Sequence, residues 1–179
     1  MVDGTDIRRN LRGWQMNLGY IPQSIYLLDD TIRRNIALGI PDREIDEEAL
    51  DNAIRAARLD DLVADLPNRA DSRLGERGIR LSGGQRQRVG IARAIYQNPD
   101  VLVMDEATSN VDSNTERAIV ESINALKGDR TLIMVAHRLS TVRNCERLYF
   151  IKEGRIEQMG TYEELCARHP EFRSMATAG

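Results

Sequence analysis

The 179-residue sequence contains little of what marks secreted, membrane-spanning or nucleic-acid-binding proteins. Its two cysteines, Cys145 and Cys166, are too few for a disulfide framework or a zinc site, and we interpret both as packing residues. No apolar run reaches the roughly 20 residues that span a bilayer, so any association with a membrane is expected to depend on a partner. The formal net charge of −3 argues against a nucleic-acid partner, because such proteins usually carry a basic excess. After these exclusions, the length of the chain fits a single globular domain that can bury a hydrophobic core.

Short apolar runs that alternate with helical patterns predict an α/β fold with a mostly parallel sheet. Strands are expected at 17–22, 101–104, 131–135 and 148–151, and a helix is expected at 112–127. Asp46 and Thr161 are placed to cap two further helices. We divide the chain into a helical block at about 24–97 that is inserted beside the sheet, core strands and helices at 98–168, and a loose tail at 169–179. Within this fold, two short stretches and two single residues carry the chemistry.

The first stretch, Leu-Ser-Gly-Gly-Gln at 81–85, opens a helix predicted over 83–97. Ser82 is placed to cap this helix, and Gly83 and Gly84 leave backbone N–H groups uncovered. Helix N-termini carry partial positive charge and free donors, so they bind phosphate. Arg86 and Arg88 add positive potential. Taken alone, the stretch also fits a plain glycine turn before a helix.

The second stretch is the pair Asp105-Glu106, which follows the apolar run 101–104. A carboxylate at the C-terminal end of a buried strand lies at the edge where α/β folds bind ligands. Asp105 can hold Mg²⁺ through water, and Glu106 can orient or deprotonate an attacking water. The alternative is that the two residues are an acidic pair in a solvated loop, without a functional role.

Gln23 and His137 also follow predicted strands. His137 falls at the same sheet edge as Asp105 if their strands are parallel, and it could donate a hydrogen bond to a terminal phosphate. The Gln23 amide could bind the metal or position water. Taken alone, each fits the plainer interpretation better, Gln23 as a surface glutamine and His137 as a structural histidine.

Together these motifs resemble the ATP-binding cassette of ABC transporters over nearly the whole chain. The matching stretches, in order, are Tyr-Ile-Pro-Gln at 20–23, Leu-Ser-Gly-Gly-Gln at 81–85, Asp105-Glu106, Ser-Asn-Val-Asp at 109–112, and His137. The resemblance implies a P-loop NTPase-like α/β fold with an inserted helical subdomain, an ATPase activity, and ATP and Mg²⁺ as cofactors.

The resemblance also implies roles for the residues that serve the chain's own ATP. Gln23 is then the Q-loop residue that touches Mg²⁺ and water, and Asp105 is the Walker B aspartate. Glu106 becomes the catalytic base and His137 the switch histidine.

Other residues are implied to face the second subunit of a dimer. Ser82, Gly83, Gly84 and Gln85 form the signature that caps the γ-phosphate of ATP held by the opposite subunit, and Asp112 closes the D-loop. Asn110-Val111 departs from the Ala-Leu that is usual in exporters, so communication across the dimer is expected to differ.

Three further stretches resemble exporter cassettes in particular. Residues 73–78 look like the loop that touches transmembrane helices, and residues 25–32 and 136–141 are also similar to exporter sequences. The nearest resemblance is to bacterial lipid, peptide or glycolipid exporters. The implied partners are the transmembrane domain of an exporter and a second nucleotide-binding domain, identical or not, at the cytoplasmic face of the plasma (inner) membrane.

The sequence contains no Gly-x-x-x-x-Gly-Lys-Ser/Thr loop, which cradles the β- and γ-phosphates in this family. The opening residues 1–7 resemble the segment that follows that loop's helix, so we interpret the cassette as N-terminally truncated. We therefore expect this chain alone to bind ATP poorly and to be marginally stable.

Two alternatives remain beside the ATPase interpretation. In one, the chain is a non-catalytic half-cassette that lends only Ser82–Gln85 to a partner's ATP. In the other, it is an ABC-type DNA-maintenance ATPase. Such ATPases carry long coiled coils, and the absence of sustained heptad repeats from this sequence argues against that alternative.

Overall fold

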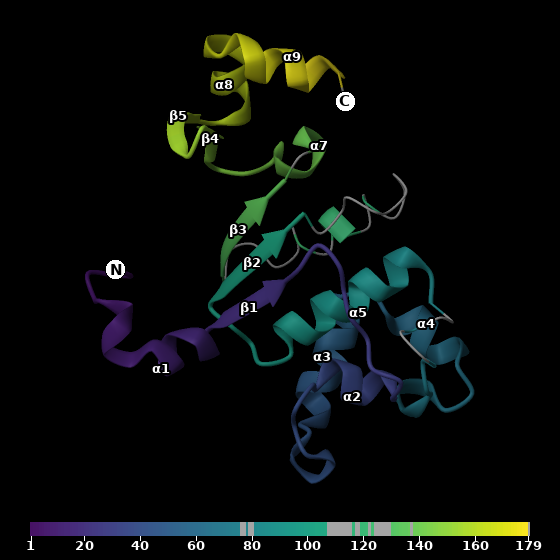
Figure 1. Cartoon of the computed structure of the whole chain (residues 1–179). Helices are drawn as coiled ribbons and strands as arrows, with labels where there is room; N and C mark the ends of the chain where they lie inside the picture. The colour runs from purple at the N-terminus through teal and green to yellow at the C-terminus, as the bar shows by residue number, and fades with distance from the viewer. Residues whose placement is uncertain are drawn as a thin grey trace. The chain divides into compact units, whose positions relative to one another are not determined.

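The computed structural model describes residues 1–75, 78, 81–106, 116, 119–121, 123, 130–136 and 138–178. Contacts between residues divide the chain into two compact units, Met1–Val135 and Ala136–Gly179. Figure 1 follows the elements along the chain by colour.

The first unit is built on a three-stranded parallel sheet in the order β1-β2-β3. The strands are β1 (Leu18–Ile21), β2 (Val101–Asp105) and β3 (Thr131–Val135). They coincide with the predicted strands to within one residue at each end and confirm an α/β fold with a parallel sheet. Because the strands are parallel, their carboxyl ends meet at one edge, where ligands bind in such folds.

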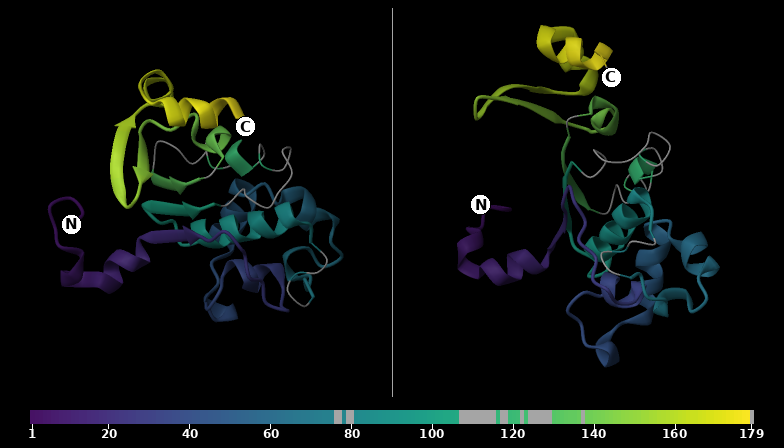
Figure 2. Two further views of the ribbon diagram at one scale, coloured as in Figure 1. Left: turned by 45° about the horizontal axis from the view of Figure 1, so that its top comes forward. Right: turned by 45° about the vertical axis from the view of Figure 1, so that its right-hand side comes forward.

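The two faces of this sheet differ in burial, as strand alternation requires. Ile21, Leu102 and Met104 are at most 2% exposed and belong to the core of the unit. On the opposite face, Tyr20 and Ile133 are about half exposed. The sheet therefore has one core face, and the views in Figures 1 and 2 show the helices of residues 32–95, which follow β1 in the chain, gathered on one side of it.

Helices make up most of the chain between β1 and β2. After the short turn η1 (Ile7–Asn10) and α1 (Leu11–Met16), which precede β1, the elements are α2 (Ile32–Ile36), η2 (Asp42–Glu44), α3 (Glu47–Ala56), α4 (Asp60–Asp65), η3 (Arg69–Asp71) and α5 (Gly83–Ile95). The predicted Asp46 cap is confirmed, since its carboxylate accepts a hydrogen bond of 3.0 Å from the Ala49 backbone N–H. The apolar stripe of α3 buries Leu50, Ala53 and Ile54.

Gly19 is where β1 and α5 approach most tightly. A Cβ atom at this position would lie 2.5 Å from the Ala94 carbonyl oxygen and 2.5 Å from Leu102 Cδ2. We expect Gly19→Ala to destabilise the chain by about 1–3 kcal/mol, because a backbone atom of α5 cannot move aside as a side chain can. Urea unfolding measures this change. The control is Ser24→Ala, in an exposed loop, which should change the free energy of unfolding by less than about 0.5 kcal/mol. Gly39→Ala is unsuitable as a control because the positive φ of Gly39 is itself unfavourable for alanine. Equal midpoints for both variants would contradict the close packing.

The second unit contains a hairpin and three helices. They are α7 (Leu139–Val142), β4 (Leu148–Lys152), β5 (Arg155–Gly160), α8 (Tyr162–Arg168) and α9 (Pro170–Ala178). β4 and β5 pair antiparallel, and Gly154 makes the turn between them with a φ of 74° that suits glycine. Thr161 caps α8 as predicted, in a reciprocal capping box with Glu164.

The loose tail expected from residue 169 is wrong, because residues Pro170–Ala178 form α9. Phe172 is only 3% exposed, and its ring packs edge-on against Phe150 at 6.0 Å and Tyr162 at 5.7 Å between centroids. The Phe172 backbone N–H also donates to His169 Nδ1 at 3.1 Å. This aromatic burial orders a segment whose local sequence looks polar.

The boundaries drawn from the sequence at 24–97 and 98–168 remain predictions. A helix expected at 112–127 falls mostly outside the described residues. In the part of the chain that the structure describes, no helix is long and apolar enough to cross a bilayer.

Candidate functional site

Two hydrogen bonds join Tyr20 of β1 and Gln23, just after β1, to the acidic pair at the end of β2. Gln23 Nε2 donates to Glu106 Oε2 at 2.6 Å. The Tyr20 hydroxyl donates to Asp105 Oδ2 at 3.1 Å. Three of the predicted site residues, Gln23, Asp105 and Glu106, therefore lie together at the carboxyl edge of the parallel sheet.

The backbone of Glu106 leaves the strand in an uncommon conformation. Its φ is 47°, in the left-handed region that costs a non-glycine residue about 1–2 kcal/mol. Its N–H still donates to the Val135 carbonyl at 2.9 Å, so the ladder between β2 and β3 is kept for one more residue. From this position the Glu106 carboxylate meets Gln23. Backbone strain of this kind is often found at functional sites.

The oxygen atoms at this edge fit a magnesium ion. Mg²⁺ is usually held by one or two carboxylates, with water and substrate phosphates completing its shell. Asp105 and Glu106 supply two carboxylates, and no cluster of three or more His, Cys, Asp or Glu that could hold a metal occurs among the described residues. Because the Gln23 amide nitrogen donates to Glu106, a role for Gln23 at the metal would use its amide oxygen.

Tyr20 is a residue of this site that the sequence analysis missed. Its hydrogen bond to Asp105, followed by partial burial and the charge of that carboxylate, raises the pKa of the Tyr20 hydroxyl above its usual value. The register pairs Tyr20 with Val103, two residues before Asp105 on the same face of the sheet. The parallel alignment of 18–21 with 101–104 was therefore the signal that could have found it.

The signature stretch opens α5 as predicted. Ser82 Oγ accepts a hydrogen bond of 3.2 Å from the Gln85 N–H, and Gln85 Oε1 accepts one of 2.8 Å from the Ser82 N–H. This reciprocal capping box fixes the first turn of a 13-residue helix. Ser82 and Gly83 are exposed, so the opening of α5 faces solvent.

We expect Ser82→Ala to lower the free energy of unfolding by about 1 kcal/mol through loss of this cap. Ser24→Ala, at an exposed serine in the loop after β1, is the control and should shift the free energy of unfolding by less than about 0.5 kcal/mol. Urea denaturation of the three proteins measures both changes. A Ser82→Ala midpoint equal to that of the original chain would show that the cap contributes nothing to folding.

The segment after Gln23 is anchored on the same helix. Arg93 of α5 donates to the Tyr26 carbonyl at 3.1 Å and to the Asn35 carbonyl at 2.8 Å, and burial lowers the pKa of its guanidinium. A Cβ atom on Gly90 would lie 2.3 Å from Ile25 Cδ1, so the segment also lies directly against α5. Residues 25 and 26, which closely follow Gln23, therefore pack on the same helix that the signature opens.

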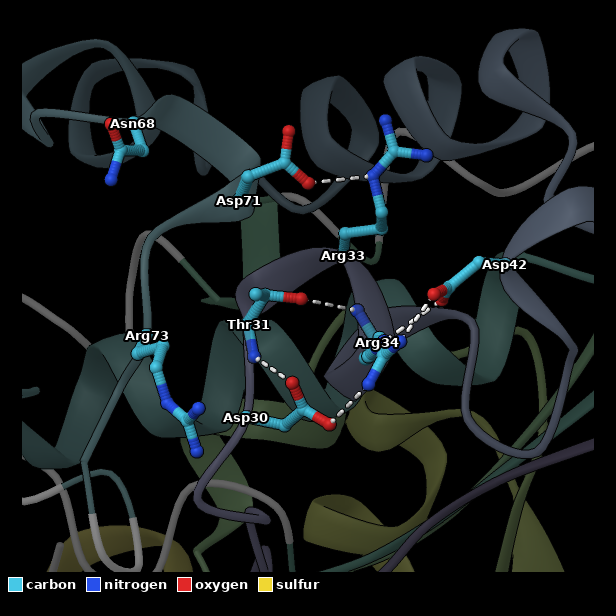
Figure 3. A pocket seen from close by; sticks show the side chains of 8 residues that line it. All are labelled: Asp30, Thr31, Arg33, Arg34, Asp42, Asn68, Asp71 and Arg73. Carbon is cyan, nitrogen blue, oxygen red and sulfur yellow. Dashed lines mark hydrogen bonds and ion pairs between the residues drawn. The ribbon is translucent and has the colours of Figure 1, made fainter.

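A surface pocket of about 610 Å³ lies away from these residues, around the start of α2 (Figure 3). It is lined by Asp30, Thr31, Arg33, Arg34, Asp42, Asn68, Asp71 and Arg73. Figure 3 shows Arg34 between Asp30, at 3.2 Å, and Asp42. The Thr31 backbone N–H and then Arg34 lower the pKa of Asp30. Its arginines and aspartates thus pair with each other, and we assign the pocket no ligand.

Two predicted site residues, Asp112 and His137, lie outside the described residues, as do 109–111. The structure therefore brings together Gln23, Asp105 and Glu106, and it places Ser82, Gly83, Gly84 and Gln85 at the start of α5. The roles of all these residues remain predictions.

Comparisons with known proteins agree with the family resemblance seen in the sequence. The family model described as ABC transporter matches residues 1–109. The chain is 42% identical, over 93% of its length, to an ATP-dependent lipid A-core flippase of Methylobacillus flagellatus, and 39% identical, over 99%, to the putative multidrug export ATP-binding/permease protein YgaD of Bacillus subtilis. These matches span 29% and 30% of the relatives' own lengths. A solved bacterial Atm1-family ABC exporter with ATP bound superimposes with a TM-score of 0.81 at 37% identity, over 92% of this chain and 29% of that one.

Proposed function

Because this chain belongs to the ABC transporter family, as a nucleotide-binding domain of the exporter type, we propose that it hydrolyses ATP to power export across a membrane. The contact between Gln23 and Glu106 beside Asp105 carries the proposal. It supports the proposed roles of Glu106 as base, Gln23 as orienting amide and Asp105 as metal-binding carboxylate, because the three residues lie at the edge where α/β folds bind ligands.

The proposed reaction is the attack of water on the γ-phosphate of ATP. Glu106 accepts a proton from the water, whose oxygen forms a bond to phosphorus while the bond to the ADP oxygen breaks. The Gln23 N–H holds the Glu106 carboxylate in place. Bound Mg²⁺ supplies neutralisation of phosphate charge, and Asp105, through water, and Gln23 would hold it. His137 is proposed to donate a hydrogen bond to the terminal phosphate.

The signature is proposed to serve a different nucleotide. Ser82 and Gly83 are exposed at the positive end of α5, which suits the γ-phosphate of ATP brought by a second nucleotide-binding domain. Gly84, Gln85 and Asp112 are assigned to the same interface. The transmembrane domain of an exporter is the other proposed partner, and the cytoplasmic face of the plasma (inner) membrane is the proposed location.

The test is phosphate release by the exporter that contains this chain. Hydrolysis should require Mg²⁺ and should be lost with EDTA and with Asp105→Asn. Hydrolysis that survives both treatments would overturn the proposal. Isothermal titration of the 179-residue chain alone with Mg-ATP should show poor binding, because the sequence has no glycine-rich phosphate loop. Micromolar affinity would contradict this expectation.

A second candidate function also rests on the absence of a glycine-rich phosphate loop from this sequence. The chain lacks the phosphate loop but has a fully capped signature helix, so it could lend only Ser82–Gln85 to a partner's ATP. Mixing the chain with a complete exporter cassette separates the two functions. A gain in ATPase activity that Ser82→Arg abolishes and Glu106→Gln leaves intact would favour the half-cassette.

A further inference from the structure

We propose that Tyr20 is a positioning residue for Asp105 and that its hydroxyl sets how tightly this edge of the sheet binds a divalent cation. The inference rests on the proposed function, which assigns the Asp105 carboxylate to Mg²⁺. It adds a residue of β1 to a site otherwise built from Gln23, which follows β1, and from the acidic pair at the end of β2.

The strand register brings the two side chains together. Tyr20 and Val103 are partners across β1 and β2, and Asp105 is the next residue on the same face. The Tyr20 hydroxyl reaches along this face to Asp105 Oδ2 at 3.1 Å. This is an ordinary hydrogen-bond length between a phenol and a carboxylate, although longer than the most common values.

Burial does not account for a tyrosine at this position. Its side chain is 51% exposed, whereas its strand neighbour Ile21 is 1% exposed and belongs to the core. Any apolar residue would serve an exposed strand position equally well for packing, but only the phenol gives Asp105 a donor. The hydroxyl is thus the part of Tyr20 with a specific partner.

A hydrogen bond to one carboxylate oxygen fixes the orientation of the other. With Oδ2 held by Tyr20, Oδ1 is the atom left to face a cation or its bound water. Carboxylates at metal sites are commonly held by such outer hydrogen bonds, and their removal typically weakens metal binding by about 10–100-fold. The Gln23 bond does the same for Glu106, so residues 20–23 orient both acids from one stretch of backbone.

The experiment uses Mn²⁺ as the probe on the full 179-residue chain. Paramagnetic broadening of the backbone amide signals of Asp105 and Glu106 is followed as Mn²⁺ is added. We expect Tyr20→Phe to need about 10–100-fold more Mn²⁺ than the original chain for half-maximal broadening. The urea midpoint should be nearly unchanged, which separates this effect from a loss of folding.

Tyr149→Phe is the matched control, because Tyr149 is 52% exposed on a strand of the other unit. It should titrate like the original chain. A Tyr20→Phe variant that titrates like the original chain, while Asp105→Asn loses the broadening, overturns the inference and leaves the proposed function intact. If the original chain and Asp105→Asn respond to Mn²⁺ identically, the metal role of Asp105 fails, and the inference fails with it.

Discussion

Glu106→Gln is expected to lower kcat for ATP hydrolysis by about 10²–10⁴-fold in the exporter that contains this chain, which is the range that a general base contributes. Glutamine has the shape of glutamate but cannot accept a proton from water. The left-handed turn at Glu106 and its backbone bond to Val135 do not depend on the carboxylate, so the fold should be unaffected. Phosphate release at saturating Mg-ATP measures kcat, and the KM for ATP should change much less.

The matched control for this variant is Glu121→Gln. Glu121 is an exposed glutamate that pairs with Arg58 at 2.7 Å, far from the acidic pair in sequence. Loss of an exposed ion pair costs at most about 1 kcal/mol of stability, so kcat should stay close to that of the original protein. A Glu106→Gln exporter that turns over as fast as the Glu121→Gln exporter would show that Glu106 is not the base.

The second large effect is expected from Ser82→Arg, which should reduce ATP hydrolysis by about 10²–10³-fold, as does the loss of one donor from a site that stabilises negative charge. The arginine side chain fills the exposed opening of α5, where the γ-phosphate of the partner's ATP is proposed to lie. Loss of the cap costs only about 1 kcal/mol, so the helix itself should remain. Phosphate release by the assembled exporter measures the effect.

Ser82→Ala separates capping from phosphate contact. It removes the same cap as Ser82→Arg but leaves the space in front of the helix open. We expect its ATPase activity to lie well above that of Ser82→Arg. Equal activities for the two variants would mean that the cap alone, and not a phosphate at the helix opening, explains the loss.

Much of the fold followed from local patterns in the sequence. The three parallel strands are short apolar runs, and the helices α3, α5 and α8 begin at Asp46, Ser82 and Thr161, whose side chains cap them as predicted. Local hydrogen bonds of this kind need only neighbouring residues, which is why sequence reveals them. Helix α9 was missed because its order depends on Phe172 meeting Phe150 and Tyr162, contacts that no local pattern encodes.

The candidate site likewise contains residues that the sequence predicted and residues that it could not predict. Gln23 and the pair Asp105-Glu106 were each predicted to follow a strand, and the 2.6 Å bond between Gln23 and Glu106 shows that the ends of these two parallel strands are neighbours. Tyr20 needed the register between strands that are 80 residues apart. The Arg93 anchor was beyond prediction for another reason: its acceptors are the backbone carbonyls of Tyr26 and Asn35, which every residue type carries.

The central claim is that Glu106 and Ser82 serve two different nucleotides. For an exporter that pairs two copies of this chain, mixing the Glu106→Gln and Ser82→Arg exporters, each expected to be nearly inactive alone, tests it directly. In a mixed dimer one ATP site has both residues intact and the other has neither. Random pairing of equal amounts should therefore restore about a quarter of the original ATPase rate, since about half of the dimers are mixed and each holds one intact site. A mixture as inactive as its components would contradict the account, because it would mean that both residues act on the same ATP.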